Sequence, residues 1–190
     1  MSCGAAADTQ QSAAAPALDA LSTSTGFRSL RYDANEGFFL NEQHYKVRGF
    51  CDHNDLANVG MAVTDRLHLF RAQASRSVGG NGRRTSHNPA APVMLDIYDR
   101  IGITVMDENR EFDNNTEDVN NMGSMVKRDR NHPSIIIWSF CNEAGCEGKL
   151  EVRYHFQRFH HQIPDFQHAL SNMTPFIDLT VQIPCNFLGF

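Results

Sequence analysis

The residues best suited to chemistry in this sequence are Asn142 and Glu143, which follow the uninterrupted apolar run at residues 135–138. An apolar strand that ends on a carboxyl group surrounds that group with apolar walls, and desolvation raises its pKa. A carboxyl group with a raised pKa can act as a general acid near neutral pH. The Asn142 amide could bind a hydroxyl group of a ligand. The alternative interpretation is a solvated glutamate in the loop that follows the strand.

A second polar group follows another predicted strand. Arg84, Ser86 and His87 end the segment "GNGRRTSH", and His53 stands in "CDHND", after an earlier apolar stretch. Arg84 could orient a nucleophilic carboxylate, and His87 could hydrogen-bond a ligand hydroxyl. The alternative is a buried polar network that only holds the fold together, and the residues alone leave both interpretations open.

Acidic residues crowd the end of a third predicted strand, where neighbouring carboxylates raise one another's pKa or require a cation. Hard oxygen ligands suit magnesium, but a salt bridge from Arg110 to Asp107 or Glu108 explains the group more simply. The histidines near the C-terminus lack a carboxylate that would complete a zinc site. We therefore predict no metal site. The acidic group comprises Asp107, Glu108, Asn109 and Glu111, and the histidines are His155, His160, His161 and His168.

Alternating strands and helices have to position these side chains. Apolar periodicity predicts strands over residues 46–50, 80–87, 103–109 and 134–143, and helices over 64–78, 90–102 and 120–131. This alternation is typical of parallel βαβ units. Each strand ends in polar groups, as in a (β/α)₈ barrel, whose strand ends converge on one site. The absence of a GxGxxG or P-loop motif argues against a nucleotide-binding doubly wound sheet. The predicted fold class is α/β, a partial TIM (β/α)₈ barrel of about the first four βα units.

The barrel segment is flanked by regions of different composition. Residues 1–25 are rich in Ala, Ser, Thr and Gln and predict a disordered tail. Residues 26–45 predict two or three antiparallel strands with tight turns, the remnant of a β-structure that leads into the barrel. Residues 46–148 form the predicted half-barrel, and residues 149–190 a divergent C-terminal tail.

Composition excludes several classes of partner. The net charge of −5 gives no basic surface for nucleic acid or an anionic membrane. No apolar run approaches the ~18 residues of a membrane span, and no secretory signal is visible, which favours the cytoplasm. The five cysteines form no CxxC pair and are interpreted as reduced thiols.

Two long segments resemble a known family. "DRNHPSIIIWSFCNEAG" and "NGRRTSHNPAAPVMLDIYDRIGITVMDEN" are similar to the two signatures of glycoside hydrolase family 2, the family of β-galactosidases and β-glucuronidases. "GFFLNEQHYKVRGFCDHND" resembles the family's passage into its barrel, so the resemblance covers residues 26–148. It implies that Glu143 is the general acid/base and that Asn142 contacts the sugar 2-hydroxyl. It implies further that His87 and His53 are active-site histidines and that Arg84 supports the nucleophile.

The chain also departs from the family pattern. Asn88 stands where the family usually has Tyr, and Glu111 lies in a shifted register without the histidine of the magnesium-binding members, so no cofactor is expected. The retaining mechanism needs two carboxylates about 5–5.5 Å apart. The nucleophilic Glu belongs on the seventh strand, but residues 149–190 do not align and offer Glu151, Asp165 and Asp178.

The resemblance predicts a β-galactosidase-like retaining hydrolase. Its substrate is a terminal non-reducing β-D-galactose of a β-galactoside or oligosaccharide, and this chain alone is expected to be weakly active or inactive. The alternative is a non-catalytic fragment that associates with a partner or binds sugar weakly. An open half-barrel exposes a sheet edge and an apolar face, and both favour association, including a homo-oligomer.

Overall fold

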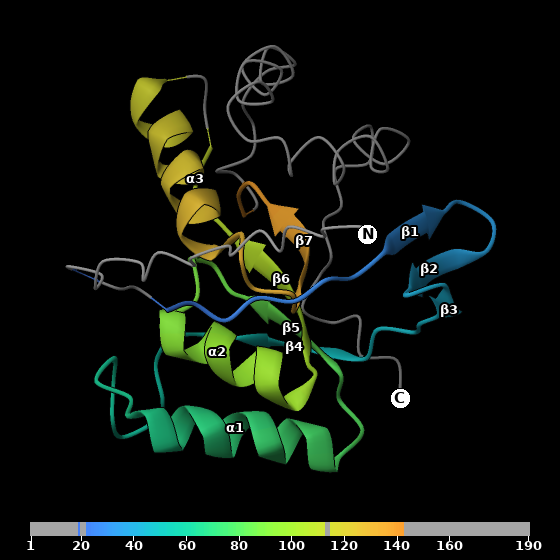
Figure 1. Ribbon diagram of the computed structural model, residues 1–190. Coiled ribbons are helices and arrows are strands. Elements are labelled where there is room, and N and C mark those ends of the chain that lie inside the picture. Colours follow the sequence, from blue (N-terminus) through green and yellow to red (C-terminus); the bar gives the residue numbers. More distant parts are fainter. Residues whose placement is uncertain (1–18, 20–21, 113–114, 143–190) are drawn as a thin grey trace, which may run out of the picture.

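The computed structural model describes residues 19, 22–112 and 115–142. This part contains a three-stranded and a four-stranded sheet with three helices (Figure 1). Of the predicted N-terminal tail, residues 19 and 22–25 are described and belong to no helix or strand. Glu143, the C-terminal histidines and the tail at 149–190 lie outside the described residues.

The small sheet confirms the antiparallel strands predicted before the barrel. Its strands pair in sequential order, and both pairs are antiparallel. The carboxylate of Asp33 accepts hydrogen bonds from the backbone N–H groups of Asn35 (2.8 Å) and Glu36 (2.9 Å), and Gly37 follows with φ 91°. Together these residues make the tight turn between the first two strands. The strands are β1 (Leu30–Asp33), β2 (Gly37–Leu40) and β3 (Gln43–His44).

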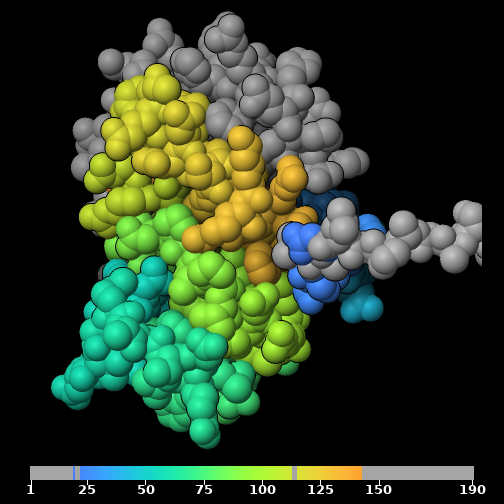
Figure 2. Space-filling view, turned by 60° about the vertical axis from the view of Figure 1, so that its left-hand side comes forward, coloured from blue at the N-terminus to red at the C-terminus, as the bar shows by residue number. Residues whose placement is uncertain are grey.

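The chain entering the small sheet also contacts the large one, at β7 (Ile135–Ser139). The Arg28 guanidinium and the Tyr32 hydroxyl donate hydrogen bonds to the carbonyls of Ile135 and Ile136. Burial raises the pKa of Tyr32, so its hydroxyl stays protonated and remains a donor. Figure 2 shows this N-terminal segment, in blue, against the orange β7. Side-chain hydrogen bonds to the backbone therefore join the two sheets.

The large sheet has the strand order of a barrel. All its pairs are parallel, and the order is sequential, β4-β5-β6-β7. A doubly wound sheet reverses its strand order at a switch point, whereas barrel strands follow one another around the axis. This order confirms the predicted partial barrel. The remaining strands are β4 (Gly49–Asp52), β5 (Gly82–Thr85) and β6 (Thr104–Glu108).

The helices connect these strands, and proline, glycine and capping side chains set the ends of α2 and the start of α3. Helix α2 has Pro92 in its first turn and ends at Gly102, which adopts the left-handed conformation at φ 70°. Helix α3 begins before the predicted residue 120, because the Asn115 side chain accepts a hydrogen bond from the Asp118 N–H at 2.9 Å. Figure 1 shows α1 and α2 side by side and α3 near β7. The helices are α1 (Asp65–Ser77), α2 (Pro92–Ile101) and α3 (Thr116–Asp129).

The apolar core lies between the helices and the large sheet. Leu95 on α2 and Val105 on β6 are completely buried and belong to one cluster, and Met122 and Met125 on α3 belong to another. Trp138, inside β7, is partly buried and packs against both clusters. The core thus holds the strands in place from one face of the sheet.

Two further observations bear on the sequence predictions. No helix in the described part of the chain has both the length and the apolar character needed to cross a bilayer. Cys51 carries a free thiol, but Cys141 is disulfide-bonded, so the expectation of reduced thiols is wrong at that position.

Candidate active site

The candidate site forms where the parallel strands end, on the face of the sheet opposite the helices. Strand register sets it up: Cys51 pairs with Arg84 across β4 and β5, and Glu108 pairs with Ser139 across β6 and β7. Successive residues of a strand point to opposite faces, and paired residues of neighbouring parallel strands point to the same face. Arg84, Glu108 and Ser139 consequently reach the same side, and their side chains meet.

An ion pair between Arg84 and Glu108 is the centre of this group. Arg84 Nε donates to Glu108 Oε2 and an Arg84 terminal nitrogen to Oε1, both at 2.8 Å, which is the bidentate geometry of a strong charge-assisted pair. Glu108 is 1% exposed, and its Oε2 also accepts a hydrogen bond from the Ser139 hydroxyl at 3.0 Å. Burial alone would lower the pKa of Arg84, but the hydrogen bonds and charge of Glu108 outweigh it and raise that pKa. Arg84 is therefore a fixed cation.

Arg84 connects the ion pair to two residues that follow the strand ends. Its terminal NH₂ group donates to Asn142 Oδ1 at 2.7 Å and lies 3.2 Å from His87 Nδ1. His87 Nδ1 is also 3.3 Å from Glu108 Oε1, so the ion pair sets the position of the imidazole ring from both sides. One guanidinium thereby organises an amide and an imidazole around a single point.

His53 joins the group from the loop after β4. Its exposed ring packs edge-to-face on His87, with centroids 5.1 Å apart. Arg71 on α1 holds this loop, donating to the carbonyls of His53 (2.9 Å) and Asp55 (3.0 Å) while it pairs with the carboxylate of Asp52. The helix thus fixes the backbone that carries His53.

Comparisons with known proteins identify the family of this chain. The sequence model described as "Glycosyl hydrolases family 2, TIM barrel domain" matches residues 33–118 and 111–163, more than half of the chain. The chain belongs to glycoside hydrolase family 2. It is 38% identical over 141 residues to a beta-galactosidase of Bacteroides ovatus, a match that covers 67% of this chain and 16% of that protein. It is 30% identical over 151 residues to a beta-glucuronidase of Bacteroides fragilis, a match that covers 72% of this chain and 22% of that protein.

A solved structure shows the same fold. The beta-glycosidase from Bacteroides vulgatus superposes with a TM-score of 0.68 at 36% sequence identity, over 74% of this chain and 20% of that one. The chain therefore spans about a sixth to a fifth of the length of these relatives.

The structure brings together four of the five residues that the sequence singled out. Arg84, His87, His53 and Asn142 lie within one connected group of contacts. Glu143 lies outside the described residues, so its placement beside this group stays a prediction. Its neighbour Asn142 is the last described residue before it.

Sequence reasoning missed the role of Glu108 and of Ser139. It assigned Arg110 as the partner of Asp107 or Glu108, which is wrong: the partner of Glu108 is Arg84. Arg110 is exposed and contributes its backbone carbonyl, which accepts from the Asn142 N–H at 3.3 Å. The alternation of side chains along parallel strands could have revealed this pair. Arg84 and Glu108 lie at the ends of neighbouring strands, at positions whose side chains point to the same face of the sheet.

The crowded acidic residues do not form a joint site. Asp107 faces the helices, where its Oδ1 accepts from the Thr85 hydroxyl (3.2 Å) and the Ala90 N–H (3.3 Å), while Glu108 faces the other side of the sheet. Among the described residues, the group whose ligand atoms come within 4.8 Å of one another is Asp96, Asp99 and His132.

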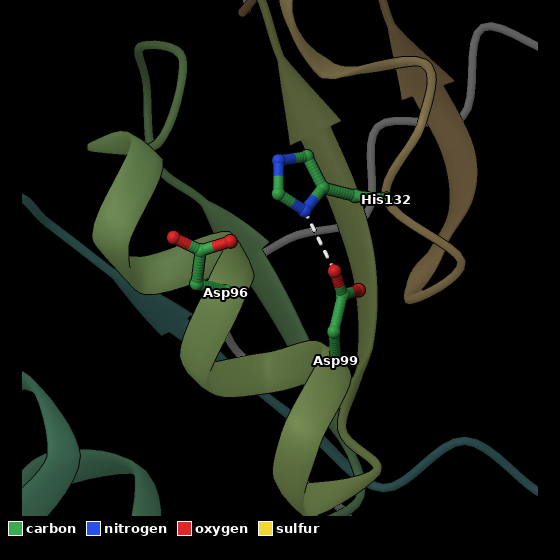
Figure 3. Close-up of side chains that lie close together, drawn as sticks. All are labelled: Asp96, Asp99 and His132. Atoms are coloured by element: carbon green, nitrogen blue, oxygen red, sulfur yellow. Dashed lines mark hydrogen bonds and ion pairs between the residues drawn. The ribbon is translucent and has the colours of Figure 1, made fainter. Parts of the chain in front are cut away.

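That group lies at the opposite ends of the strands and has a structural explanation (Figure 3). His132 Nδ1 lies 2.7 Å from Asp99 Oδ2, and Asp99 Oδ1 accepts from the Ser134 N–H at 3.0 Å. The hydrogen bond to Asp99 raises the pKa of His132, which favours the protonated ring beside the carboxylate. The pair ties α2 to the turn before β7.

Proposed function

We propose that the protein to which this chain belongs hydrolyses β-linked terminal galactose from galactosides, with retention of configuration. The single observation that carries the proposal is the convergence of Arg84, His87 and Asn142 at the strand ends, directly before Glu143. In a retaining glycosidase one carboxylic acid protonates the leaving oxygen and later activates water. Glu143 takes this role in the proposal.

The donors around Asn142 suit a sugar ligand. Its Oδ1 is occupied by Arg84, whereas Nδ2 makes no hydrogen bond to a described residue, so that nitrogen is free to donate to a sugar hydroxyl. His53 and His87 offer further ring nitrogens beside it. Hydrogen bonds of this kind strengthen in the oxocarbenium-like transition state of glycoside hydrolysis.

The proposed sugar rests on the relatives. The protein 38% identical to this chain and another at 34% identity are named beta-galactosidases, whereas others at 30–34% identity are named beta-glucuronidases. Galactose is the first choice because the 38% relative carries that name. Glucuronate is the competing sugar, so each assay includes a β-glucuronide beside the β-galactoside.

The proposed mechanism also limits what this chain does alone. Glu108 is buried and paired with Arg84, so it is not available as a nucleophile. After the described ranges, Glu151, Asp165 and Asp178 lack the surroundings expected of the nucleophile. We expect the chain to bind galactosides weakly and to turn them over at or near the background rate.

The experiment measures binding and turnover in parallel. Purified chain is assayed with 4-nitrophenyl β-D-galactoside and β-D-glucuronide, and binding of the methyl glycosides is followed through the fluorescence of Trp138, the single tryptophan. Saturable galactoside binding supports the proposal. Turnover that disappears in Glu143→Gln also supports it and would show that a nucleophile is present after all. Absence of both binding and turnover with the galactoside refutes it.

The open sheet supports a second candidate function, association with another chain. In the described part of the sheet, β4 and β7 each pair with a strand on one side. Unpaired strand edges can add another strand. Sedimentation equilibrium distinguishes the two: a monomer across the micromolar range rules out self-association.

A further inference from the structure

We propose that Glu108 is a positioning residue that fixes the orientation of the Asn142 amide through Arg84, so that Asn142 presents an N–H group to the sugar. The inference deepens the function proposed above and rests on it for the identity of the ligand. It concerns a residue whose side chain is too buried to touch a sugar, since Glu108 is 1% exposed.

The first step is the orientation of the amide. Arg84 carries donors and no acceptor, so the Asn142 atom that faces it at 2.7 Å must be the oxygen. The Nδ2 group then points away from Arg84. Reversing the amide would set two donors against each other and leave the oxygen toward the ligand.

The second step is what holds Arg84 itself. Glu108 binds the guanidinium at two atoms, each at 2.8 Å, which fixes the plane of the group as well as its position. The same terminal nitrogen that contacts Glu108 Oε1 reaches Asn142. A rotation of the guanidinium would therefore remove the donor from Asn142.

The third step is what holds Glu108. Its Oε2 accepts from the Ser139 hydroxyl at 3.0 Å, and its backbone N–H donates to the Thr85 hydroxyl at 2.9 Å. These contacts come from the neighbouring strands β5 and β7, so the carboxylate is anchored by the sheet. The sheet therefore fixes Glu108, Glu108 fixes the guanidinium of Arg84, and Arg84 fixes the amide of Asn142.

Nuclear magnetic resonance of the ¹⁵N-labelled full chain tests this sequence of contacts directly. The two signals are the Arg84 Nε–H and the side-chain amide of Asn142, recorded with and without methyl β-D-galactoside and methyl β-D-glucuronide. In Glu108→Gln we expect hydrogen exchange of the Arg84 Nε–H to accelerate about tenfold or more, since charge-assisted bonds are lost. We also expect the Asn142 amide signals to move and the galactoside-induced shift of that amide to disappear.

Three further variants separate positioning from stability. Glu108→Asp restores the charge at shorter reach and should recover part of the Arg84 protection. Ser139→Ala removes one hydrogen bond to Glu108 Oε2 and should change both signals in the same direction as Glu108→Gln, but by a smaller amount. If Glu108→Gln fails to fold, this variant tests the positioning role in its place. Asp99→Asn breaks a half-buried ion pair at the other end of the strands and should leave both signals unchanged while lowering stability.

This experiment distinguishes failure of the positioning role from failure of the proposed function. Unchanged Arg84 exchange and Asn142 signals in folded Glu108→Gln, or in Ser139→Ala, overturn the positioning role. If the unmodified chain responds to neither glycoside, the proposed function fails, but the two signals without sugar still decide whether Glu108 holds Arg84 and Asn142.

Discussion

The buried carboxyl group of Asp107 should make the stability of this protein depend on pH. Asp107 and Asp129 are both completely buried, and Arg128 binds Asp129 at two atoms, at 2.6 and 2.7 Å. The Oδ2 atom of Asp107 receives no hydrogen bond from a described residue. Arg128 thus neutralises Asp129, whereas Asp107 has no cation of its own and is favoured in its neutral, protonated form.

The size of the effect follows from the pKa. Burial first, and then the charge of Asp129, raise the pKa of Asp107 from 3.8 to about 7. A rise of this size corresponds to about 4 kcal/mol at most. Because the folded pKa lies above the unfolded one, the folded state binds the proton more tightly. The stabilising contribution is complete below pH ~4 and is lost as the pH rises through about 7.

Asp107→Asn should remove this dependence. The amide keeps an oxygen that can accept from Thr85 and Ala90 and supplies an N–H for Asp129. Relative to the variant, the unmodified protein should lose up to about 1.4 kcal/mol of unfolding free energy per pH unit between pH 5 and 7. Urea unfolding followed by Trp138 fluorescence at pH 5, 6, 7 and 8 measures the difference. The variant should be at least as stable as the unmodified protein at pH 8.

A matched control is Asp55→Asn, which neutralises an exposed aspartate and should keep the pH dependence of the unmodified protein. Parallel curves for Asp107→Asn and the unmodified protein would refute the reasoning. A variant that loses several kcal/mol at pH 8 would do so too, because Asp107 would then be needed as a carboxylate.

Three further predictions concern single contacts. Leu95→Ala should lower the unfolding free energy by about 2–5 kcal/mol in urea titrations, since Leu95 is 0% exposed, and a loss below 1 kcal/mol would mean the core at α2 collapses around the gap. Asn115→Ala should cost about 1 kcal/mol and reduce hydrogen-exchange protection in the first turn of α3, where its side chain caps the helix; equal protection in both proteins would contradict the cap. Asp99→Asn should destabilise most near pH 6 and less near pH 9, because the raised pKa of His132 gives a contribution that is full below its unfolded pKa and lost as the pH rises through the folded one; a loss independent of pH in thermal melts would show that His132 is neutral.

Local chemistry in the sequence was sufficient to locate α2 and β7. Pro92 and Gly102 marked the ends of α2, and the apolar run before Asn142 marked β7. The start of α3 was predicted too late, although Val119 precedes Met122 at helical spacing and packs against the same cluster. The three residues before Val119 are polar and give no apolar signal, so the cap at Asn115 is the better guide to the helix start.

The ion-pair partners of charged side chains were harder to predict from the sequence. Arg110 is adjacent to the acidic cluster in the chain, and this proximity suggested a salt bridge that the structure does not contain. Glu108 pairs instead with Arg84, a residue 24 positions earlier, because parallel register brings the ends of β5 and β6 together.

The sequence by itself determined the alternation of strands and helices, the family, and the types of residue available for chemistry, since these depend on periodicity and on motifs that are local in the chain. Only the tertiary structure decided that Arg84, Glu108, Ser139 and Asn142 form one connected group while Asp107 faces the helices. The physical reason is that neighbouring residues of a strand point to opposite faces, whereas the ends of parallel strands bring distant residues into contact.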